Sequence, residues 1–600
     1  MQRDSSSTRT FSRVSVNTTR FGLGCLLVLA ACTTPRTPKP DDSLERARIA
    51  GEAVRTAPRR TAAWRCTPAV PSPLPSPATR AERTGFCETT PYDEAMVFLD
   101  SVRANAAPNR IMRIARLGAS PRGRPLMVVT ACARASRSAD TCADVASPAR
   151  RKPVVLVQAN IHAGEVEGKE AVLALLRTVV TDAKPNLLDS LTLIVVPMYN
   201  ADGNEALGPQ TRNRGAQLGP AIVGERANGD GLDLNRDYIK AEAPETRALL
   251  PLLAGGGVDV FVDLHTTNGS YHGFTLTWSP SLHPGAPLAQ FTSDTLLAGI
   301  RRRLWRKHVK TYPYGNFSNS FAREVSLDAN KEGWFTYDSR PRFGTNYFGL
   351  TGGIAILSEA FSHDPFATRV SSTSAFLREV LGTVGADRSI LARVTATRRA
   401  LAAGVAARGL VLDTKLTTRP FSDSVLVEDL LADPDSLGAE PGVPLGIRRS
   451  GQIRPQWMPV YDRFESLRET NVPAGGWLIE ARDTAVLALL QRHGVTVRAG
   501  IAGARPIDVE RFQLDSVQRA VREFQGHREV TVLGHWVRAR MLPSADWRWV
   551  PAAQRQLLVA AQILEPQSND GATTWNLFDE RLLMGKYHPV MRVITRVATR

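Results

Sequence analysis

Two residues able to bind a metal ion follow a short apolar run. His162 and Glu165 come just after residues 154–157, Val-Val-Leu-Val, a run typical of a buried parallel strand, and residues 171–180 have the length and spacing of a covering helix. Open α/β sheets place their sites at the carboxyl ends of such strands. Because imidazole and carboxylate both bind zinc, we interpret His162 and Glu165 as two ligands of a catalytic zinc ion. The alternative for so short a pattern is a surface loop.

A third candidate ligand ends a second apolar run. Residues 258–265, VDVFVDLH, predict another strand that ends on His265. Two histidines and one glutamate leave a fourth zinc position open for water. The alternative is a hydrogen-bonded strand-end histidine, and His272 and His283 compete with His265 for the role.

A turn-rich segment with two arginines lies between these ligands. Residues 225–237, ERANGDGLDLNRD, contain Arg226, Asn235 and Arg236. The chain has, in order, a strand followed by His-x-x-Glu, then Asn-Ala-Asp-Gly at 200–203, then Arg-x-Asn-x-x-Gly-x-Asp-x-Asn-Arg, and then a strand that ends on a histidine. This order resembles the zinc metallocarboxypeptidases of the carboxypeptidase A type. The spacing is similar to that of bacterial members, and the likeness covers residues 91–380, about half of the chain.

This resemblance implies a role for each matching residue. His162, Glu165 and His265 would bind one zinc ion per chain, and Arg226 would polarise the scissile carbonyl and stabilise its oxyanion. Asn235 and Arg236 would bind the terminal carboxylate of the substrate. These roles also agree with guanidinium chemistry, since arginine binds carboxylates in bidentate fashion and stabilises developing negative charge. Arg212 and Arg214 compete with Arg226, and solvated loop charge is the alternative for both Arg226 and Arg236.

A carboxylate that does not bind the metal is needed to move a proton. Residues 353–359, GIAILSE, predict a strand that ends on Glu359, which resembles the general base of the family. The resemblance also implies a tyrosine that covers the substrate, for which we favour Tyr337 over Tyr347. Arg340 and Arg342 suggest a preference for acidic terminal residues.

The first residues have the pattern of an export signal. Residues 1–20 are polar with several arginines, and residues 21–31 are an apolar run too short to span a bilayer. Leu29-Ala30-Ala31-Cys32 resembles a bacterial lipobox, which would make Cys32 the acylated first residue. Pro-rich sequence follows and predicts an extended tether. We expect an exported protein, periplasmic or on the cell surface, lipid-anchored to the outer membrane.

The remaining cysteines fit such a compartment. An oxidising setting predicts two disulfides among Cys66, Cys87, Cys132 and Cys142. Pairing of sequence neighbours, Cys66 with Cys87 and Cys132 with Cys142, is the most economical of the three connectivities.

Length and composition allow more than one domain with its own hydrophobic core. The chain has 600 residues, of which 43% are hydrophobic. Alternating strand and helix patterns predict an α/β domain with a mixed, mostly parallel sheet and helices on both faces. We place the signal peptide at 1–31, the lipidated cysteine and tether at 32–85, the catalytic domain at 86–384 and an α+β accessory domain at 385–600. In the last, residues 475–499 predict a strand, a helix and a strand.

The sequence thus predicts a zinc-dependent carboxypeptidase acting on peptides with a free C-terminal carboxylate in the cell envelope. Three alternatives stay open: a peptidase that trims peptidoglycan stem peptides, an acylamino-acid deacylase, and an inactive carboxypeptidase-like lipoprotein that binds partners. The net charge of +17 comes from dispersed basic residues without a nucleic-acid-binding module, so no nucleic-acid partner is expected.

Overall fold

A computed structural model describes residues 66–595 except 137–138, 140, 143–146, 148–151, 318–332, 407–408, 433–446 and 501–505. The expected signal peptide, the expected acylation site Cys32 and most of the expected tether lie outside the described residues. Among the helices of the described part, none is both long and apolar enough to cross a membrane.

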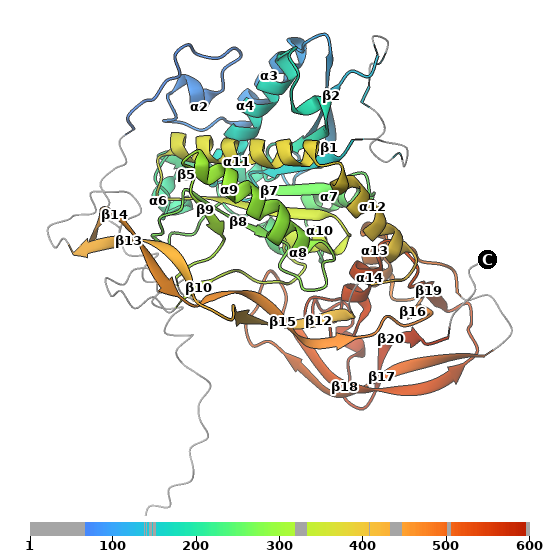
Figure 1. The fold of residues 1–600 in the computed structure, drawn as a ribbon. Coiled ribbons are helices and arrows are strands. Elements are labelled where there is room, and N and C mark those ends of the chain that lie inside the picture. The colour runs from blue at the N-terminus through green and yellow to red at the C-terminus, as the bar shows by residue number, and fades with distance from the viewer. Residues whose placement is uncertain are drawn as a thin grey trace, which may run out of the picture. The chain divides into compact units, whose positions relative to one another are not determined.

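An eight-stranded mixed sheet organises the first part of this structure (Figure 1). Its strand order is β1-β2-β4-β3-β7-β11-β8-β9. The four central strands β4, β3, β7 and β11 are parallel, whereas β1, β2 and β8 join by antiparallel pairing. The bounds are β1 Arg110–Ala119, β2 Pro125–Ala133, β3 Val154–Ala159, β4 Thr192–Val196, β7 Val260–Thr266, β8 Leu276–Pro280, β9 Thr311–Pro313 and β11 Ile354–Ala360. The predicted fold class is confirmed.

Both faces of the sheet are covered, because side chains alternate along each strand. In β3, Val155 and Val157 join one core with α3, α4, α9 and α11, while Val154 and Leu156 join the other with α7 and α10. The helices of this part are α2 Arg80–Arg83, α3 Tyr92–Ala104, α4 Glu167–Thr181, α5 Ala201–Glu205, α6 Gln210–Asn213, α7 Pro244–Ala254, α8 Ala289–Phe291, α9 Ala298–Arg306, α10 Gly344–Leu350, α11 Phe366–Ala386 and α12 Ser389–Ala402. Short elements complete it: η1 Leu187–Asp189, η2 Leu234–Arg236, the π-helical turn η3 Thr292–Leu297, β5 Gly208–Pro209, β6 Ile222–Val223 and β10 Trp334–Phe335.

Parallel pairing brings the predicted site residues to one edge of the sheet. Strands β3, β7 and β11 are neighbours, and their carboxyl ends lie together. His162 follows β3, whereas His265 and Glu359 stand directly opposite each other in the register of β7 and β11. One edge of the sheet therefore receives three side chains from a stretch of nearly 200 residues of sequence.

The C-terminal region is rich in antiparallel strands. A five-stranded sheet has the order β18-β17-β20-β16-β19, while β15 joins β10 and β12 and β13 pairs with β14. The bounds are β12 Leu410–Thr418, β13 Asp423–Ala432, β14 Ile447–Met458, β15 Val460–Thr470, β16 Gly476–Glu480, α13 Thr484–Arg492, β17 Ile507–Arg519, β18 Val530–Met541, β19 Trp547–Val550, α14 Leu557–Leu564, η4 Asp579–Arg581 and β20 Tyr587–Val593. The strand and helix predicted within 475–499 form as β16 and α13, but the expected second strand is only a single β-bridge at Arg498.

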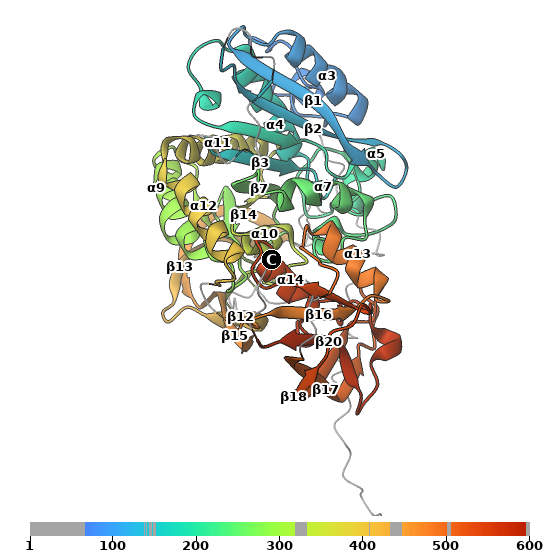
Figure 2. The same ribbon diagram turned by 90° about the vertical axis from the view of Figure 1, so that its right-hand side faces the viewer.

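This C-terminal region shares a hydrophobic core with the eight-stranded sheet. Helix α13 contacts α7, and α14 contacts α10 and α12 (Figure 2). Trp477 and Leu490 belong to the same buried cluster as Leu156 and Phe261. The domain limit near residue 385 stays a prediction, but the packing is continuous across it.

A buried ion pair joins the two regions next to α10. The Nε atom of Arg342 donates to Asp570 Oδ1 at 2.8 Å, and its backbone N–H donates to Oδ2 at 2.6 Å. The indole N–H of Trp575 also donates to Asp570, and the guanidinium of Arg342 lies 4.5 Å from the Trp575 ring centroid. Both charged side chains are almost fully buried, so each depends on the other for its charge balance.

Both predicted disulfides are present. Cys66 pairs with Cys87 and Cys132 with Cys142, with Cα–Cα distances of 5.4 and 5.9 Å. Sequence separations of 21 and 10 residues make both bridges local, and both lie ahead of His162 in the sequence.

Replacing Arg342 by methionine should lower the free energy of unfolding by about 3–5 kcal/mol, because the substitution leaves Asp570 buried without its partner. Urea unfolding of the full-length protein measures this change. The matched control is Arg538→Met, whose side chain is 83% exposed, and it should change stability by no more than about 0.5 kcal/mol. Equal effects of the two substitutions would contradict the assigned role of the buried pair.

Candidate active site

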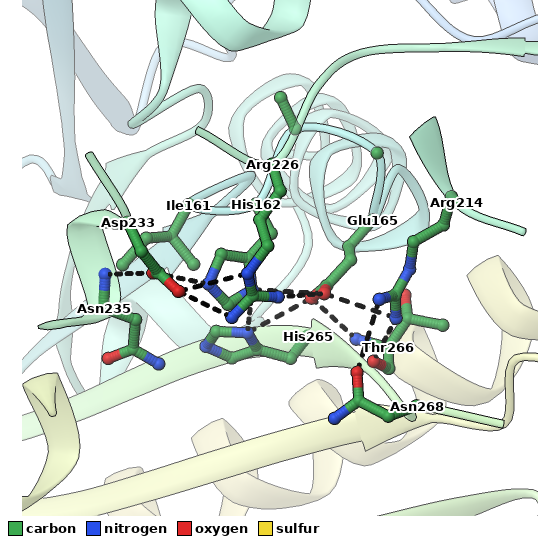
Figure 3. A network of polar contacts seen from close by, with 12 residues as sticks. Ile161, His162, Glu165, Arg214, Arg226, Asp233, Asn235, His265, Thr266 and Asn268 are labelled. Atoms are coloured by element: carbon green, nitrogen blue, oxygen red, sulfur yellow. Dashed lines mark hydrogen bonds and ion pairs between the residues drawn. The ribbon is translucent and has the colours of Figure 1, made fainter. Parts of the chain in front are cut away.

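Three buried side chains converge at the carboxyl edge of the sheet (Figure 3). His162 Nδ1 lies 3.1 Å from Glu165 Oε1, and His265 Nδ1 lies 3.2 Å from both His162 Nδ1 and Glu165 Oε2. The backbone N–H of Thr266 donates to Glu165 Oε2 at 3.0 Å and so fixes the carboxylate. The sequence predicted these same three residues, and the fold brings them together.

The spacing of these donor atoms fits a tetrahedral zinc ion. Zinc bonds of 2.0–2.2 Å in a tetrahedron separate neighbouring ligand atoms by about 3.3–3.6 Å. The separations of 3.1–3.2 Å found here are close to that value. Two imidazoles and one carboxylate leave a fourth position for water or substrate, as in catalytic zinc sites.

Each candidate histidine ligand faces a second carboxylate with its other ring nitrogen. His162 Nε2 lies 3.1 Å from Asp233 Oδ1, and His265 Nε2 lies 3.0 Å from Asp263 Oδ2. Such partners orient histidine ligands and raise their basicity in metal sites. Neither aspartate was predicted from the sequence, although two signals were present: Asp263 stands two residues before His265 on one strand face, and Asp233 lies inside the arginine-bearing loop.

Two arginines surround the carboxylate of Glu165. Arg214 Nη2 lies 3.3 Å and Arg226 Nη1 3.6 Å from Glu165 Oε1. Burial alone would raise the pKa of Glu165, but Arg214 and His162 hold that pKa well below its usual value. Arg214 is also tied to the carbonyls of Thr266 and Thr267, so it is fixed in place.

Arg226 is the more accessible of the two guanidiniums. Its side chain is 40% exposed, whereas that of Arg214 is 14% exposed. Arg226 donates through Nε and Nη2 to Asp233 Oδ2 at 3.1 and 2.9 Å. The competing residue Arg212 bonds to the side chain of its neighbour Asn213. The arrangement leaves Arg226 placed to meet a ligand and Arg214 placed to hold Glu165.

Glu359 is a buried carboxyl group beside the metal ligands. It is 7% exposed, and its Oε2 atom has no hydrogen-bond partner in the described structure. Burial raises the pKa of Glu359 to about 8, against the opposing effect of His265. A carboxyl group with a pKa near neutrality can both accept and donate a proton, as a general base and acid must.

Asn235 and Arg236 lie beside the cluster on η2. Asn235 Oδ1 accepts from the backbone N–H of Gly344 at 3.0 Å, which ties the loop to the start of α10. The guanidinium of Arg236 stacks on Phe343, 4.1 Å from its ring centroid, with a quarter of its side chain exposed. An arginine held flat against a ring retains its in-plane donors for a carboxylate.

The two candidate tyrosines differ in surroundings. Tyr347 is fully buried and bonds to His493 Nδ1 at 2.8 Å, so it belongs to the core. Tyr337 is partly exposed, and its hydroxyl group bonds to Thr345 at 2.9 Å while its ring contacts Tyr314 and Phe343.

The competing histidines lie outside the donor cluster. His272 packs among Phe274, Trp334 and Phe361, and burial lowers its pKa to about 3. His283 lies 3.3 Å from Gln562, and burial lowers its pKa to about 4.

Arg340 and Arg342 are already paired with carboxylates. Arg340 contacts Asp338, and Arg342 contacts Asp570 and Glu529. The suggestion that they select acidic terminal residues therefore loses its support.

A buried glutamate supports the loop that carries Arg226 and Asp233. Glu245 Oε2 accepts from Asn228 Nδ2 at 3.1 Å, and Asn228 Oδ1 in turn accepts from the N–H groups of Asp230 and Leu232. Burial raises the pKa of Glu245 to about 7.

Because this folded-state pKa lies above the unfolded value near 4.5, the unfolded state loses its proton first as pH rises, and stability falls between about pH 5 and 7. Glu245→Gln keeps an acceptor oxygen but removes the titration. Relative to the wild type, the variant should gain about 2 kcal/mol of stability between pH 5 and pH 8. Urea unfolding at both pH values measures this, and a constant difference between the two proteins would contradict it.

Comparison with known proteins agrees with this geometry. Residues 98–339 match the family model described as "Zinc carboxypeptidase". "Probable carboxypeptidase 2" of Trichophyton verrucosum is 28% identical over 123 residues, 20% of each chain, and "Carboxypeptidase 2" of Trichophyton rubrum is 27% identical over an equal length. The match thus spans about a fifth of the length of these relatives.

Solved structures give more distant matches. A metallo-carboxypeptidase from Burkholderia cenocepacia is 18% identical with a TM-score of 0.35, covering 49% of this chain and 70% of that one. A metallo-carboxypeptidase from Pseudomonas aeruginosa is 17% identical with a TM-score of 0.33, covering 49% and 69%. The family match contains all three candidate metal ligands, the arginine-bearing loop and Tyr337, and it ends before Glu359. Residues 98–339 of this chain are thus similar to the zinc carboxypeptidase family.

Proposed function

We propose that this protein is a zinc-dependent carboxypeptidase that hydrolyses the C-terminal bond of peptides in the cell envelope. The observation that carries the proposal is the donor cluster of His162, Glu165 and His265 with Glu359 on the adjacent strand. A zinc ion held there would act as a Lewis acid on the scissile carbonyl and would lower the pKa of water.

The protein's own residues supply the proton transfer and the charge stabilisation. Glu359 takes a proton from the attacking water and passes it to the leaving amine, and its buried position opposite His265 in the strand register places it for this transfer. Arg226 donates to the oxygen that becomes negative when the carbonyl is attacked. Loss of such a donor typically costs about 3–4 kcal/mol of transition-state stabilisation.

Recognition of a free C-terminus depends on Asn235 and Arg236. The Arg236 guanidinium offers a planar pair of N–H donors to a carboxylate, and its stacking on Phe343 reduces the entropy lost on binding. A substrate without that charge would lack this bidentate pair of hydrogen bonds to Arg236. Burial and, to a smaller extent, the nearby charge of Glu359 raise the pKa of Tyr337, which is our candidate for the tyrosine that covers the substrate.

The envelope location is a proposal from the first 32 residues. Two disulfides ahead of the metal ligands support it, because such bonds persist in oxidising compartments and are rare in the cytosol. The corresponding proposal is that Cys32 carries a lipid that anchors the chain to the outer membrane.

The full-length protein loaded with zinc should remove single C-terminal residues from a mixed peptide library, as followed by mass spectrometry. Glu359→Gln should lower this rate by about 100- to 10,000-fold, since it removes the general base and keeps the volume of the side chain. The variant should still bind zinc, because Glu359 is not a ligand. Glu465→Gln, at an exposed position on β15, is the matched control and should cleave at the wild-type rate.

C-terminal amidation of the same peptides should abolish cleavage if Arg236 recognises the carboxylate. Removal of zinc by a chelator should stop the reaction, and added zinc should restore it. Full activity of Glu359→Gln, or equal cleavage of amidated peptides, would contradict the proposed function. Zinc binding without peptide cleavage would favour peptidoglycan stem peptides or acylated amino acids as substrates.

A further inference from the structure

The tip of the β17–β18 hairpin reaches the active-site loop from the C-terminal region. Residues 520–529 connect the two strands, and Phe524 and His527 form a bridge around the two-residue turn Gln525-Gly526. Gln525 Oε1 accepts a hydrogen bond of 3.0 Å from the backbone N–H of Asp233, which lies 292 residues earlier in the chain. This contact links the C-terminal region directly to the residue that orients His162.

The backbone at Gln525 is unusual for its residue type. Gln525 has a φ of +51° and Gly526 a φ of +78°. Two consecutive positive φ values are typical of the hairpin turn in which Asn-Gly is strongly preferred. Glutamine has no such preference, so the turn alone does not explain it. Its side chain is one methylene longer than that of asparagine, and it is this side chain that contacts Asp233.

Other contacts hold the tip against the catalytic domain. His527 lies 2.8 Å from Glu242 and 3.0 Å from Asn576. Glu529 at the base of the tip pairs with Arg342 at 2.7 Å. Gln525 therefore presents its acceptor oxygen from a turn that is fixed on both sides.

The hydrogen bond from Asp233 to Gln525 affects the site through the side chain of Asp233. Its carboxylate faces His162 Nε2, accepts from Arg226 and caps the turn η2 through the N–H of Asn235. Its backbone N–H is directed away from these partners and bonds to Gln525. Fixing both ends of the residue limits the orientations that its carboxylate can adopt.

We propose that Gln525 is a positioning residue for the metal site, acting through Asp233 and His162. The C-terminal region would then contribute a residue that positions the metal ligands. The consequence for peptide hydrolysis rests on the proposed function, whereas the consequence for metal affinity does not.

The test measures the zinc affinity of the metal-free full-length protein, with Zn²⁺ and a chromophoric chelator in competition. Gln525→Asn suits the turn but is too short for the contact, so we expect its zinc Kd to rise about 3- to 10-fold, less than the loss from mutating a direct partner of a ligand. Its melting temperature should equal or exceed that of the wild type. Gln525→Glu keeps an acceptor oxygen at the same reach and should bind zinc at least as tightly as the wild type.

Val521→Ala is the matched control on the same tip, because Val521 is 90% exposed, and it should leave the zinc Kd unchanged. Wild-type affinity in Gln525→Asn would overturn the proposal. A parallel loss of affinity and melting temperature in both Gln525 variants would also overturn it, since that pattern marks a purely structural role. Failure of the wild type to cleave any peptide would contradict the proposed function. It would not affect the comparison of zinc affinities between the wild type and the Gln525 variants.

Discussion

The carboxylate of Asp233 is the interaction on which the rest of the site depends. It lies between His162 and Arg226, and Arg236 is 3.9 Å away. Burial alone would raise the pKa of Asp233, but Arg226 and His162 hold it well below the usual range. One buried carboxylate thus contacts the candidate metal ligand His162 and the two arginines Arg226 and Arg236. Without Asp233, these three side chains would lose the partner that they share.

Charge balance explains why Glu359 differs from its neighbours. Glu165 and Asp233 each have arginine partners, whereas Glu359 has a buried oxygen without any hydrogen bond in the described structure. Burial raises the pKa of Glu359 to about 8. A nearby dication would favour the ionised carboxylate, so metal binding itself would prepare Glu359 to accept a proton.

The parts of the site predicted from sequence are those that local pattern determines. A buried strand followed by a histidine places that side chain at a sheet edge, and three neighbouring parallel strands bring His162, His265 and Glu359 together. The alternation of side chains on β7 could also have identified Asp263. The loop with Arg226 and Asn235 was recognisable because its residues are close in sequence.

Contacts between distant segments could not be predicted in this way. The bond from Asp233 to Gln525 and the pair of Arg342 with Asp570 join residues more than 200 positions apart. Their formation depends on how the C-terminal region packs on the first part of the structure, where α13 contacts α7 and α14 contacts α10 and α12, which no periodicity encodes. The same packing buries Tyr347 against His493 and leaves Tyr337 partly exposed.

X-ray absorption spectroscopy of the zinc-loaded full-length protein, together with elemental analysis, tests whether His162, Glu165 and His265 bind the metal. We predict one zinc ion per chain, bound by two imidazoles and one carboxylate with bonds of about 2.0–2.2 Å, and loss of one imidazole in His265→Ala. Sulfur ligands, or an unchanged zinc environment in His265→Ala, would contradict it.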